Sequence, residues 1–286
     1  LNPTNINIDV SAGWASSTTL SGDTFIYYLS SAGTHIRKLN PATLEEEVFA
    51  ELNVATVQAR PGICVDDTGA TTIVYSVGNG EIERCVPSGL PETAGPCTPV
   101  TQVELEALPA CDIACAVYEG DVYTFGGANC TNNEPTNKVF RCDPDVQDSC
   151  TGISTWSSSP RYGIRPVKID CFNDQYVALV GGSVNKDGDT TGRVDIYDME
   201  NGQTAGSATG LGTGRRGAVT VFDPVNEQIW VFGGVDSFTG DCSQEIEVSV
   251  IPSGICFTDD PTMDPTIDPT TDPTSDPTTD PTTDPT

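Results

Sequence analysis

The feature that most constrains the fold is a long-period repeat of short apolar runs. Four of these runs end in glycine, at intervals of 48, 55 and 52 residues: Gly78, Gly126, Gly181 and Gly233. A fifth run ends in Ser30, which precedes the first glycine by 48 residues. A period of about 50 residues is typical of repeat architectures in which every unit is one small sheet. The sequence therefore predicts five units of the same kind.

Each unit contains the same series of β-rich segments. A strand precedes the apolar run, as in residues 62–65 and 218–222, and a turn rich in Asp, Gly or Asn joins the two. After a polar loop comes a strand in which apolar and polar residues alternate, which is typical of a strand with one solvated face. These alternating strands are expected at residues 35–39, 81–85, 138–142, 193–197 and 245–250. A weaker outer strand follows, as at residues 48–52 and 103–108, and four strands per unit are typical of a propeller blade.

The last unit has no outer strand of its own after Val250. Residues 6–10 read Ile-Asn-Ile-Asp-Val and have no partner strand in their own unit. We expect this segment to complete the last blade, because closing the ring removes an open sheet edge. The predicted fold is all-β, with five four-stranded blades closed by the N-terminal strand in a head of residues 1–257. A β-sandwich with irregular repeats is the alternative.

Glycine pairs and aromatic residues recur at corresponding places in the units. The apolar run closes with Gly126-Gly127, Gly181-Gly182 and Gly233-Gly234, whereas the corresponding Gly78-Asn79 is degenerate. Aromatic residues follow the pairs at Phe140, Trp156 and Tyr197.

An Arg-x-Gly element also precedes three of the runs, at Arg60, Arg161 and Arg215. With this combination of motifs, residues 11–250 resemble the kelch repeats. The resemblance implies a β-propeller and no particular activity, because one fold hosts many functions. The three arginines could gather into a binding site on one face. Their regular recurrence favours a structural role instead, with hydrogen bonds from blade to blade.

Histidine content excludes several kinds of catalysis. Kelch propellers include secreted copper-radical oxidases, whose metal centre needs two histidines, but His35 is the only histidine of the chain. A Ser-His-Asp triad is disfavoured on the same ground. Asp187 and Asp189 form a weak calcium candidate, since the further spaced acids of a full calcium loop are missing. We predict no catalytic residues and no cofactor.

The charge and the hydropathy of the chain exclude two further kinds of partner, nucleic acid and the interior of a membrane. The net charge of −28 argues against binding to nucleic acid, which requires a basic surface. No stretch approaches the roughly 18 apolar residues that a membrane-spanning helix needs. Such an acidic chain is expected to repel itself at long range and to attract cations.

Cysteine content points to an oxidising compartment. Eleven cysteines in a chain of this length are typical of a disulfide-bonded protein that is secreted or displayed at the cell surface. Equivalent places in two units make Cys85–Cys97 and Cys142–Cys150 local pairs, and Cys242–Cys256 would fasten the last strand to the tail. The odd total of cysteines leaves one free thiol or one bond to another chain. The pairing stays open for the remaining cysteines, which are Cys64, Cys111, Cys115, Cys130 and Cys171. Asn129 begins an Asn-Cys-Thr sequon and is the predicted N-glycosylation site.

A tetrapeptide repeat, Asp-Pro-Thr-x, fills the tail of residues 258–286. Proline fixes φ and the aspartates repel one another, so the expected state is an extended polyproline II rod. Threonine after proline is typical of O-glycosylated stalks. The candidate O-glycosylation sites are Thr262, Thr266, Thr270, Thr274, Thr278 and Thr282. Since polyproline II has three residues per turn, glycans at a four-residue spacing would point in three directions and sheathe the rod.

The tail resembles repeat segments of extracellular protein–glycan fibrils and cell-wall glycoproteins, in which prolines are also hydroxylated. That resemblance makes six prolines candidate hydroxyproline positions: Pro261, Pro265, Pro269, Pro273, Pro277 and Pro281.

The predicted function is that of an extracellular structural glycoprotein. We expect its partners to be copies of itself in a homopolymeric filament or coat and covalent glycans, with calcium as a further candidate. The first alternative is a carbohydrate-binding lectin or adhesin propeller with the tail as a spacer. The second is an enzyme, such as a lyase or hydrolase that uses Asp, Glu and Tyr.

Overall fold

A computed structural model describes most of residues 15–255 and contains nineteen strands there. The residues left out within that range are 21–22, 31–33, 41, 44, 53–60, 68–70, 79–80, 87–95, 102–110, 130, 157–158, 170–174, 237–241, 244 and 253. Across the described residues, no helix has the length and apolar character to cross a bilayer. The predicted closing strand at residues 6–10 and the tail lie outside the described residues.

The strands form five antiparallel sheets that follow the chain order, and each sheet is one blade. Blade 1 contains β1 (Ala15–Leu20), β2 (Asp23–Leu29), β3 (His35–Leu39) and β4 (Glu46–Glu51). Blade 2 contains β5 (Gly62–Asp66), β6 (Ile73–Gly78), β7 (Glu81–Cys85) and β8 (Thr98–Thr101). Blade 3 contains β9 (Ala114–Tyr118), β10 (Asp121–Phe125), β11 (Lys138–Cys142) and β12 (Thr151–Thr155). Blade 4 contains β13 (Arg165–Ile169), β14 (Tyr176–Val180), β15 (Val194–Asp198) and β16 (Gln203–Ser207). Blade 5 contains β17 (Val219–Asp223), β18 (Gln228–Phe232) and β19 (Ile246–Val250).

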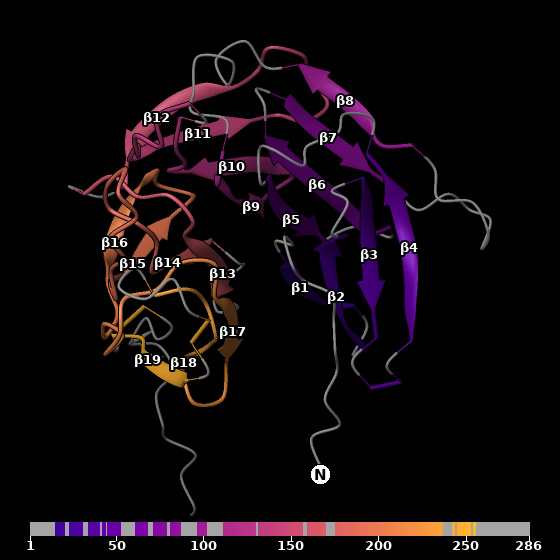
Figure 1. The fold of residues 1–286 in the computed structure, drawn as a ribbon. Helices are drawn as coiled ribbons and strands as arrows, with labels where there is room; N and C mark the ends of the chain where they lie inside the picture. The colour runs from indigo at the N-terminus through magenta and orange to yellow at the C-terminus, as the bar shows by residue number, and fades with distance from the viewer. Residues whose placement is uncertain are drawn as a thin grey trace, which may run out of the picture.

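The blades are arranged around a common centre as a β-propeller (Figure 1). The first strand of each blade lies innermost, since β1 contacts β5, β5 contacts β9, β9 contacts β13 and β13 contacts β17. Blades 1 and 5, the first and the last, lie on either side at the bottom of the view in Figure 1. The all-β fold and the five-blade propeller predicted from the repeat are therefore confirmed.

The core is divided into four apolar layers, one between each successive pair of blades. Between blades 3 and 4, for example, Tyr123 and Phe125 pack with Val177 and Leu179. The other layers join blades 1 and 2, blades 2 and 3, and blades 4 and 5 in the same way. Because blades 2, 3 and 4 each bury their two faces against different neighbours, the blades depend on one another for stability.

The glycine pairs are needed where two blades touch through their backbones. Gly181 has φ +64° and Gly182 has φ +102°, a left-handed region that disfavours other residues. A Cβ at Gly181 would also lie 2.3 Å from the carbonyl oxygen of Arg215, which belongs to the connection into the next blade. Gly126 meets the carbonyl oxygen of Arg161 in the same way, at 2.4 Å.

Two features of the blades differ from the prediction or extend it. The outer strand of blade 2 is Thr98–Thr101, which pairs with β7, whereas the predicted strand at 103–108 lies outside the described residues. Blade 5 has three strands among the described residues, so the outer edge of β19 has no fourth strand there.

Disulfides fasten the blades both internally and to one another. The predicted pairs Cys85–Cys97 and Cys142–Cys150 are confirmed. A third bond, Cys64–Cys115, joins the innermost strands of blades 2 and 3 across 51 residues of chain. Cys111 is also disulfide-bonded. Sequence spacing did not identify Cys64–Cys115, because it depends on which inner strands become neighbours.

The expected bond from Cys242 to Cys256 is wrong, because Cys242 is a free and exposed cysteine. Cys242 forms a bridge with Val235 at the end of blade 5 where β19 begins. The chain leaves β19 at the opposite end, where the amide of Ile251 donates to the carbonyl of Glu227. Cys256 itself lies outside the described residues.

We expect the interblade disulfide to stabilise the head more than the local ones. Closing a loop of 51 residues contributes about 4 kcal/mol, against about 2.5 kcal/mol for the 8-residue Cys142–Cys150 loop. Urea unfolding of Cys64→Ala/Cys115→Ala and Cys142→Ala/Cys150→Ala variants measures both losses. The control, Cys242→Ala, should unfold like the parent protein. Equal losses for the two double variants would contradict the prediction.

Candidate functional site

The most organised polar site in the head is a link between blades 3 and 4 that is centred on Arg161. Its guanidinium donates from one nitrogen to the carbonyls of Gly181 (2.7 Å) and Arg193 (3.2 Å) and pairs from another with the buried carboxylate of Asp195. All three partners belong to blade 4. The carbonyl of Arg161 itself accepts the amide of Gly127, at the end of blade 3. One residue therefore holds the ends of two blades together.

Arg215 repeats this arrangement one blade further on. Its guanidinium donates to the carbonyls of Gly233 (3.0 Å) and Glu245 (3.3 Å) and pairs with the carboxylate of Glu247. Its own carbonyl accepts the amide of Gly182, at the end of blade 4. The equivalence shows that the glycine pair, the arginine and an acid on the third strand act as one unit.

Burial sets the electrostatics of the Arg161 site. The side chain is fully buried, and its guanidinium lies 4.3 Å from the centre of the Trp156 ring. Burial lowers the pKa of Arg161 to about 10, and the charge of Asp195 opposes that shift. Arg161 is thus still a cation at neutral pH, and Asp195 balances its charge.

The structural interpretation of the repeated arginines is confirmed for Arg161 and Arg215. Each lies in its own blade connection and is enclosed by protein, so the two do not combine into one binding site. Arg60 lies outside the described residues.

Removing the buried arginine should cost far more stability than removing its exposed neighbour. Arg161→Leu leaves the buried Asp195 with only Arg193, whose side chain is 43% exposed, so we expect a loss of about 3–5 kcal/mol in urea unfolding. The matched control is Arg193→Leu, which removes a solvent-screened pair to the same carboxylate and should cost less than about 1 kcal/mol. Similar losses for both variants would show that burial does not give Arg161 its role.

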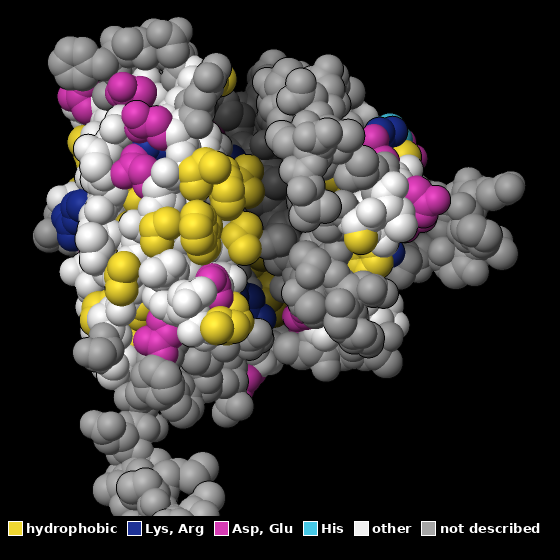
Figure 2. All heavy atoms as spheres, turned by 90° about the horizontal axis from the view of Figure 1, so that it is seen from below, with side chains coloured by type: hydrophobic (Ala, Val, Ile, Leu, Met, Phe, Trp, Pro, Cys, Tyr) yellow, Lys and Arg dark blue, Asp and Glu magenta, His cyan; other side chains and the backbone are white. Residues whose placement is uncertain are grey.

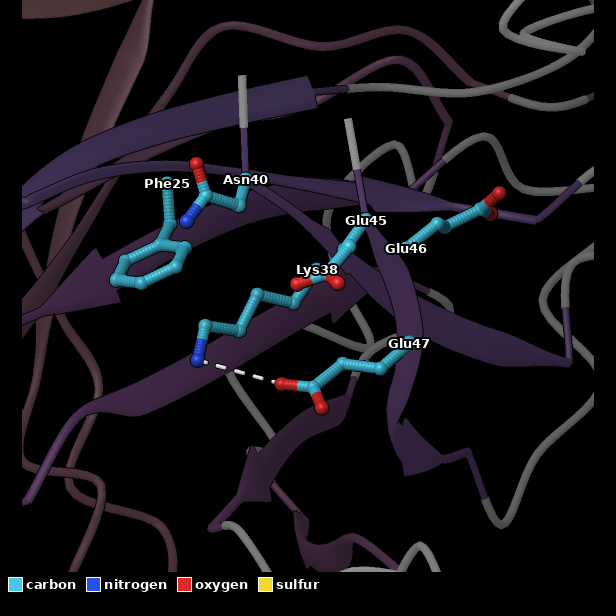
Figure 3. Close-up of a pocket in the computed structure, with 6 residues that line it drawn as sticks. All are labelled: Phe25, Lys38, Asn40, Glu45, Glu46 and Glu47. Carbon is cyan, nitrogen blue, oxygen red and sulfur yellow. Dashed lines mark ion pairs between the residues drawn. The ribbon is translucent and has the colours of Figure 1, made fainter. Parts of the chain in front are cut away.

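A cavity of about 410 Å³ lies on the outer part of blade 1 and offers a separate candidate site. Its lining is Phe25, Lys38, Asn40, Glu45, Glu46 and Glu47, which Figure 3 shows as sticks.

The charged side chains that line this cavity already have partners within the protein. Lys38 lies over the Phe25 ring, with its Nζ 4.0 Å from the ring centre, and pairs with Glu47 at 3.3 Å. Glu46 points away from Lys38 and binds the hydroxyl of Tyr28 and the guanidinium of Arg37 on the other face of the blade. A sugar ring could stack on Phe25 only after displacing Lys38.

The weak calcium candidate forms a turn that is organised by a neighbouring amide. The Oδ1 of Asn185 accepts the backbone amides of Asp187 and Asp189, both at 3.1 Å, and its Nδ2 donates to the carboxylate of Asp189. The oxygen that Asn185 would offer to a cation is thus already engaged. The described part of the chain brings no three acidic, histidine or cysteine side chains together as a metal site.

The sequon asparagine is exposed in a tight turn that follows the Gly126-Gly127 pair. The Oδ1 of Asn129 accepts the amide of Thr131 at 2.8 Å, and the carbonyl of Asn129 accepts the amide of Asn133. The side chain is therefore accessible to a glycosylating enzyme. The candidate threonines and prolines of the tail lie outside the described residues.

Secretion from a eukaryotic host should give one N-glycan on the head. We expect Asn129→Gln to lower the mass by a single glycan, and enzymatic removal of N-glycans to give the same shift in intact-mass spectrometry. Asn226→Gln, at an exposed asparagine outside any sequon, is the control. Loss of no mass in Asn129→Gln would contradict the assignment.

One surface was not identified from the sequence. On blade 5, the side of the sheet that faces away from blade 4 carries seven apolar residues, which we call the blade-5 face: Val219, Val221, Trp230, Phe232, Ile246, Val248 and Val250. Asp223 and Gln228 lie on the same side, at the turn between β17 and β18. Figure 2 shows hydrophobic side chains gathered on the blade 5 side of a hollow. The alternation of side chains along β17 and β19 indicates that the sheet has two different sides. Only the strand register shows which of these sides remains open.

Comparison with known proteins supports the fold alone. No family model and no curated protein matches the chain. By contrast, 468 chains of solved structures match it. One of them, described as the structure of YjhT, covers 84% of this chain over 81% of its own length, with a TM-score of 0.57 and 12% sequence identity. At that identity the likeness extends to the propeller architecture and not to an activity.

Proposed function

We propose that this protein is a secreted structural glycoprotein, a subunit of an extracellular filament or coat. The observation that carries the proposal is the use of the buried polar groups of the head. Arg161 with Asp195 links blades 3 and 4, and Arg215 with Glu247 links blades 4 and 5, while three described disulfides fasten blades 2 and 3 internally and to each other. The proposal assigns the head a mechanical role and no catalytic one.

Secretion and glycosylation complete the proposal. The disulfides are compatible with an oxidising environment such as the extracellular space. The repeat of residues 258–286 would form the extended element, with glycans on its threonines and hydroxyl groups on its prolines. Tails, heads or both would make the contacts between subunits. The similarity of residues 11–250 to kelch repeats adds nothing against this role, since kelch propellers serve many functions.

A carbohydrate-binding propeller is the second candidate, and the cavity of blade 1 is the observation that favours it. An aromatic ring beside polar side chains is a common arrangement for binding a sugar. In this cavity, however, Lys38 covers the ring of Phe25 and pairs with Glu47. We therefore place the structural role first.

Peptide mapping and imaging of the native material test the proposed function. We expect glycans on most of the threonines that follow proline in residues 258–286, and we expect periodic filaments or a coat in electron micrographs. The other threonines of each repeat provide the internal control for site selection. Unmodified tail threonines together with isolated particles would overturn the structural role. Specific binding of the tail-deleted head to a glycan array, without assembly, would favour the lectin.

A further inference from the structure

The outer strands of the blades differ in how their open edges are protected. An edge strand presents unpaired backbone groups to any other chain, and proteins block such edges with charged side chains, proline or short strands. In blade 1, β4 carries Glu46, Glu47 and Glu51. In blade 2, β8 is four residues long and contains Pro99. These two outer strands are therefore protected against pairing with another chain.

The outer strands of blades 3 and 4 lack this protection. β12 reads Thr-Gly-Ile-Ser-Thr and β16 reads Gln-Thr-Ala-Gly-Ser, with neither a charge nor a proline. Four of the five residues of each strand are exposed. A bulge interrupts both strands, but β4 has a bulge at the same place in addition to its charges. The bulge is thus common to protected and unprotected blades and does not replace the missing charges.

The backbone of each unprotected edge offers donors to a partner. The amide of Trp156 donates toward β11, and that of Ala208 donates toward β15. Because N–H groups alternate in direction along a strand, the preceding amides of Thr155 and Ser207 point away from their sheets. Among the described residues no strand lies beyond β12 or β16.

We propose that β12 of one head pairs antiparallel with β16 of a second copy of this chain, so that two blades join into one continuous sheet. This inference rests on the proposed function and deepens it, because it names the partner of the head and the surface used. Addition of a strand to an open edge gains affinity from backbone hydrogen bonds.

Two charged side chains select this arrangement of the strands. Lys138 lies opposite Thr155 on β11, and Glu200 lies in the turn that leads into Gln203. Both are exposed, and neither forms an ion pair within the described part of the head. Antiparallel pairing of β12 with β16 sets the Thr155 end of one copy beside the Gln203 end of the other. Lys138 then approaches Glu200 of the second copy.

Other charged side chains beside the two edges have partners within their own head. The ion pairs are Arg141 with Asp121, Asp145 with Arg84, and Arg193 with Asp195. Pairing β12 with β12 would turn Lys138 toward Arg141 of the other copy, because Arg141 lies opposite Thr151. Like charges would then approach each other, which disfavours that alternative.

The arrangement of the two edges makes the contact open-ended. β12 and β16 lie at different places on the periphery of the ring (Figure 1), so one neighbour does not cover both. A pair made from two different edges leaves β16 of the first copy and β12 of the second free for further copies. Such heterologous contacts grow into filaments when they do not close into a ring.

Sedimentation of the full-length glycoprotein over a range of concentrations tests the pairing. We expect the parent protein to form oligomers larger than a dimer as its concentration rises. Thr155→Pro and Ser207→Pro each remove one outward amide and should weaken self-association by about tenfold or more. Thr155→Ala and Ser207→Ala keep these amides and are the matched controls, which should stay within about twofold of the parent. Thermal unfolding confirms that each variant is folded.

Mixing the two proline variants tests which strands pair. Each variant alone should be monomeric, because one kind of edge is blocked in every copy. An equal mixture should form dimers that grow no further, since β12 of the Ser207→Pro copy remains free to pair with β16 of the Thr155→Pro copy. Association of Ser207→Pro with itself would show that β12 pairs with β12 and would overturn the inference.

A charge exchange tests the antiparallel direction without altering the backbone. Lys138→Glu should weaken self-association, and Lys138→Glu combined with Glu200→Lys should restore it to within about threefold of the parent. Absence of this rescue would overturn the proposed arrangement, as would a parent protein that stays monomeric at every concentration. Native filaments that persist in the proline variants would overturn the strand pairing and leave the structural function intact. Monomeric heads together with no native filaments would overturn both.

Discussion

The link made by Arg161 is the interaction on which the head depends. Its carbonyl accepts the amide of Gly127 from one blade while its guanidinium donates to the carbonyl of Gly181 in the next. Among the described residues no β-ladder joins one blade to the next, so the sheets are held by contacts of this kind, the apolar layers, Cys64–Cys115 and single links such as the hydrogen bond from the amide of Cys97 to the carbonyl of Glu51. The close approach of the backbones explains why glycine, with no Cβ, ends the second strand.

Because neighbouring blades stabilise one another, the last blade of the series differs from the others. In repeat proteins each unit is stabilised by its neighbours, and a terminal unit exposes the face that the next unit would have covered. Blade 5 is such a terminal unit, and its uncovered residues are apolar although the chain as a whole is strongly acidic. An isolated acidic propeller would be more soluble with polar residues on this face.

The periodic features of the sequence allowed most of the fold to be predicted, because they report local structure. The glycine intervals located five blades, and the alternation at residues 81–85 and 138–142 matches β7 and β11 exactly in extent. Contacts between units were harder to predict. Cys64–Cys115 depends on the rotation from one blade to the next, and the predicted Cys242–Cys256 pair is contradicted by the free thiol of Cys242. The open side of blade 5 likewise follows from register and not from spacing.

The described chain ends beside the last strand of blade 5. The chain leaves β19 beside the turn of Glu227 and continues from Ile255 toward the repeat that begins at residue 258. The described chain therefore ends on the blade that carries the open face, whereas the sequon at Asn129 lies in blade 3, which is separated from blade 5 by blade 4. A glycan at Asn129 would leave the blade-5 face accessible.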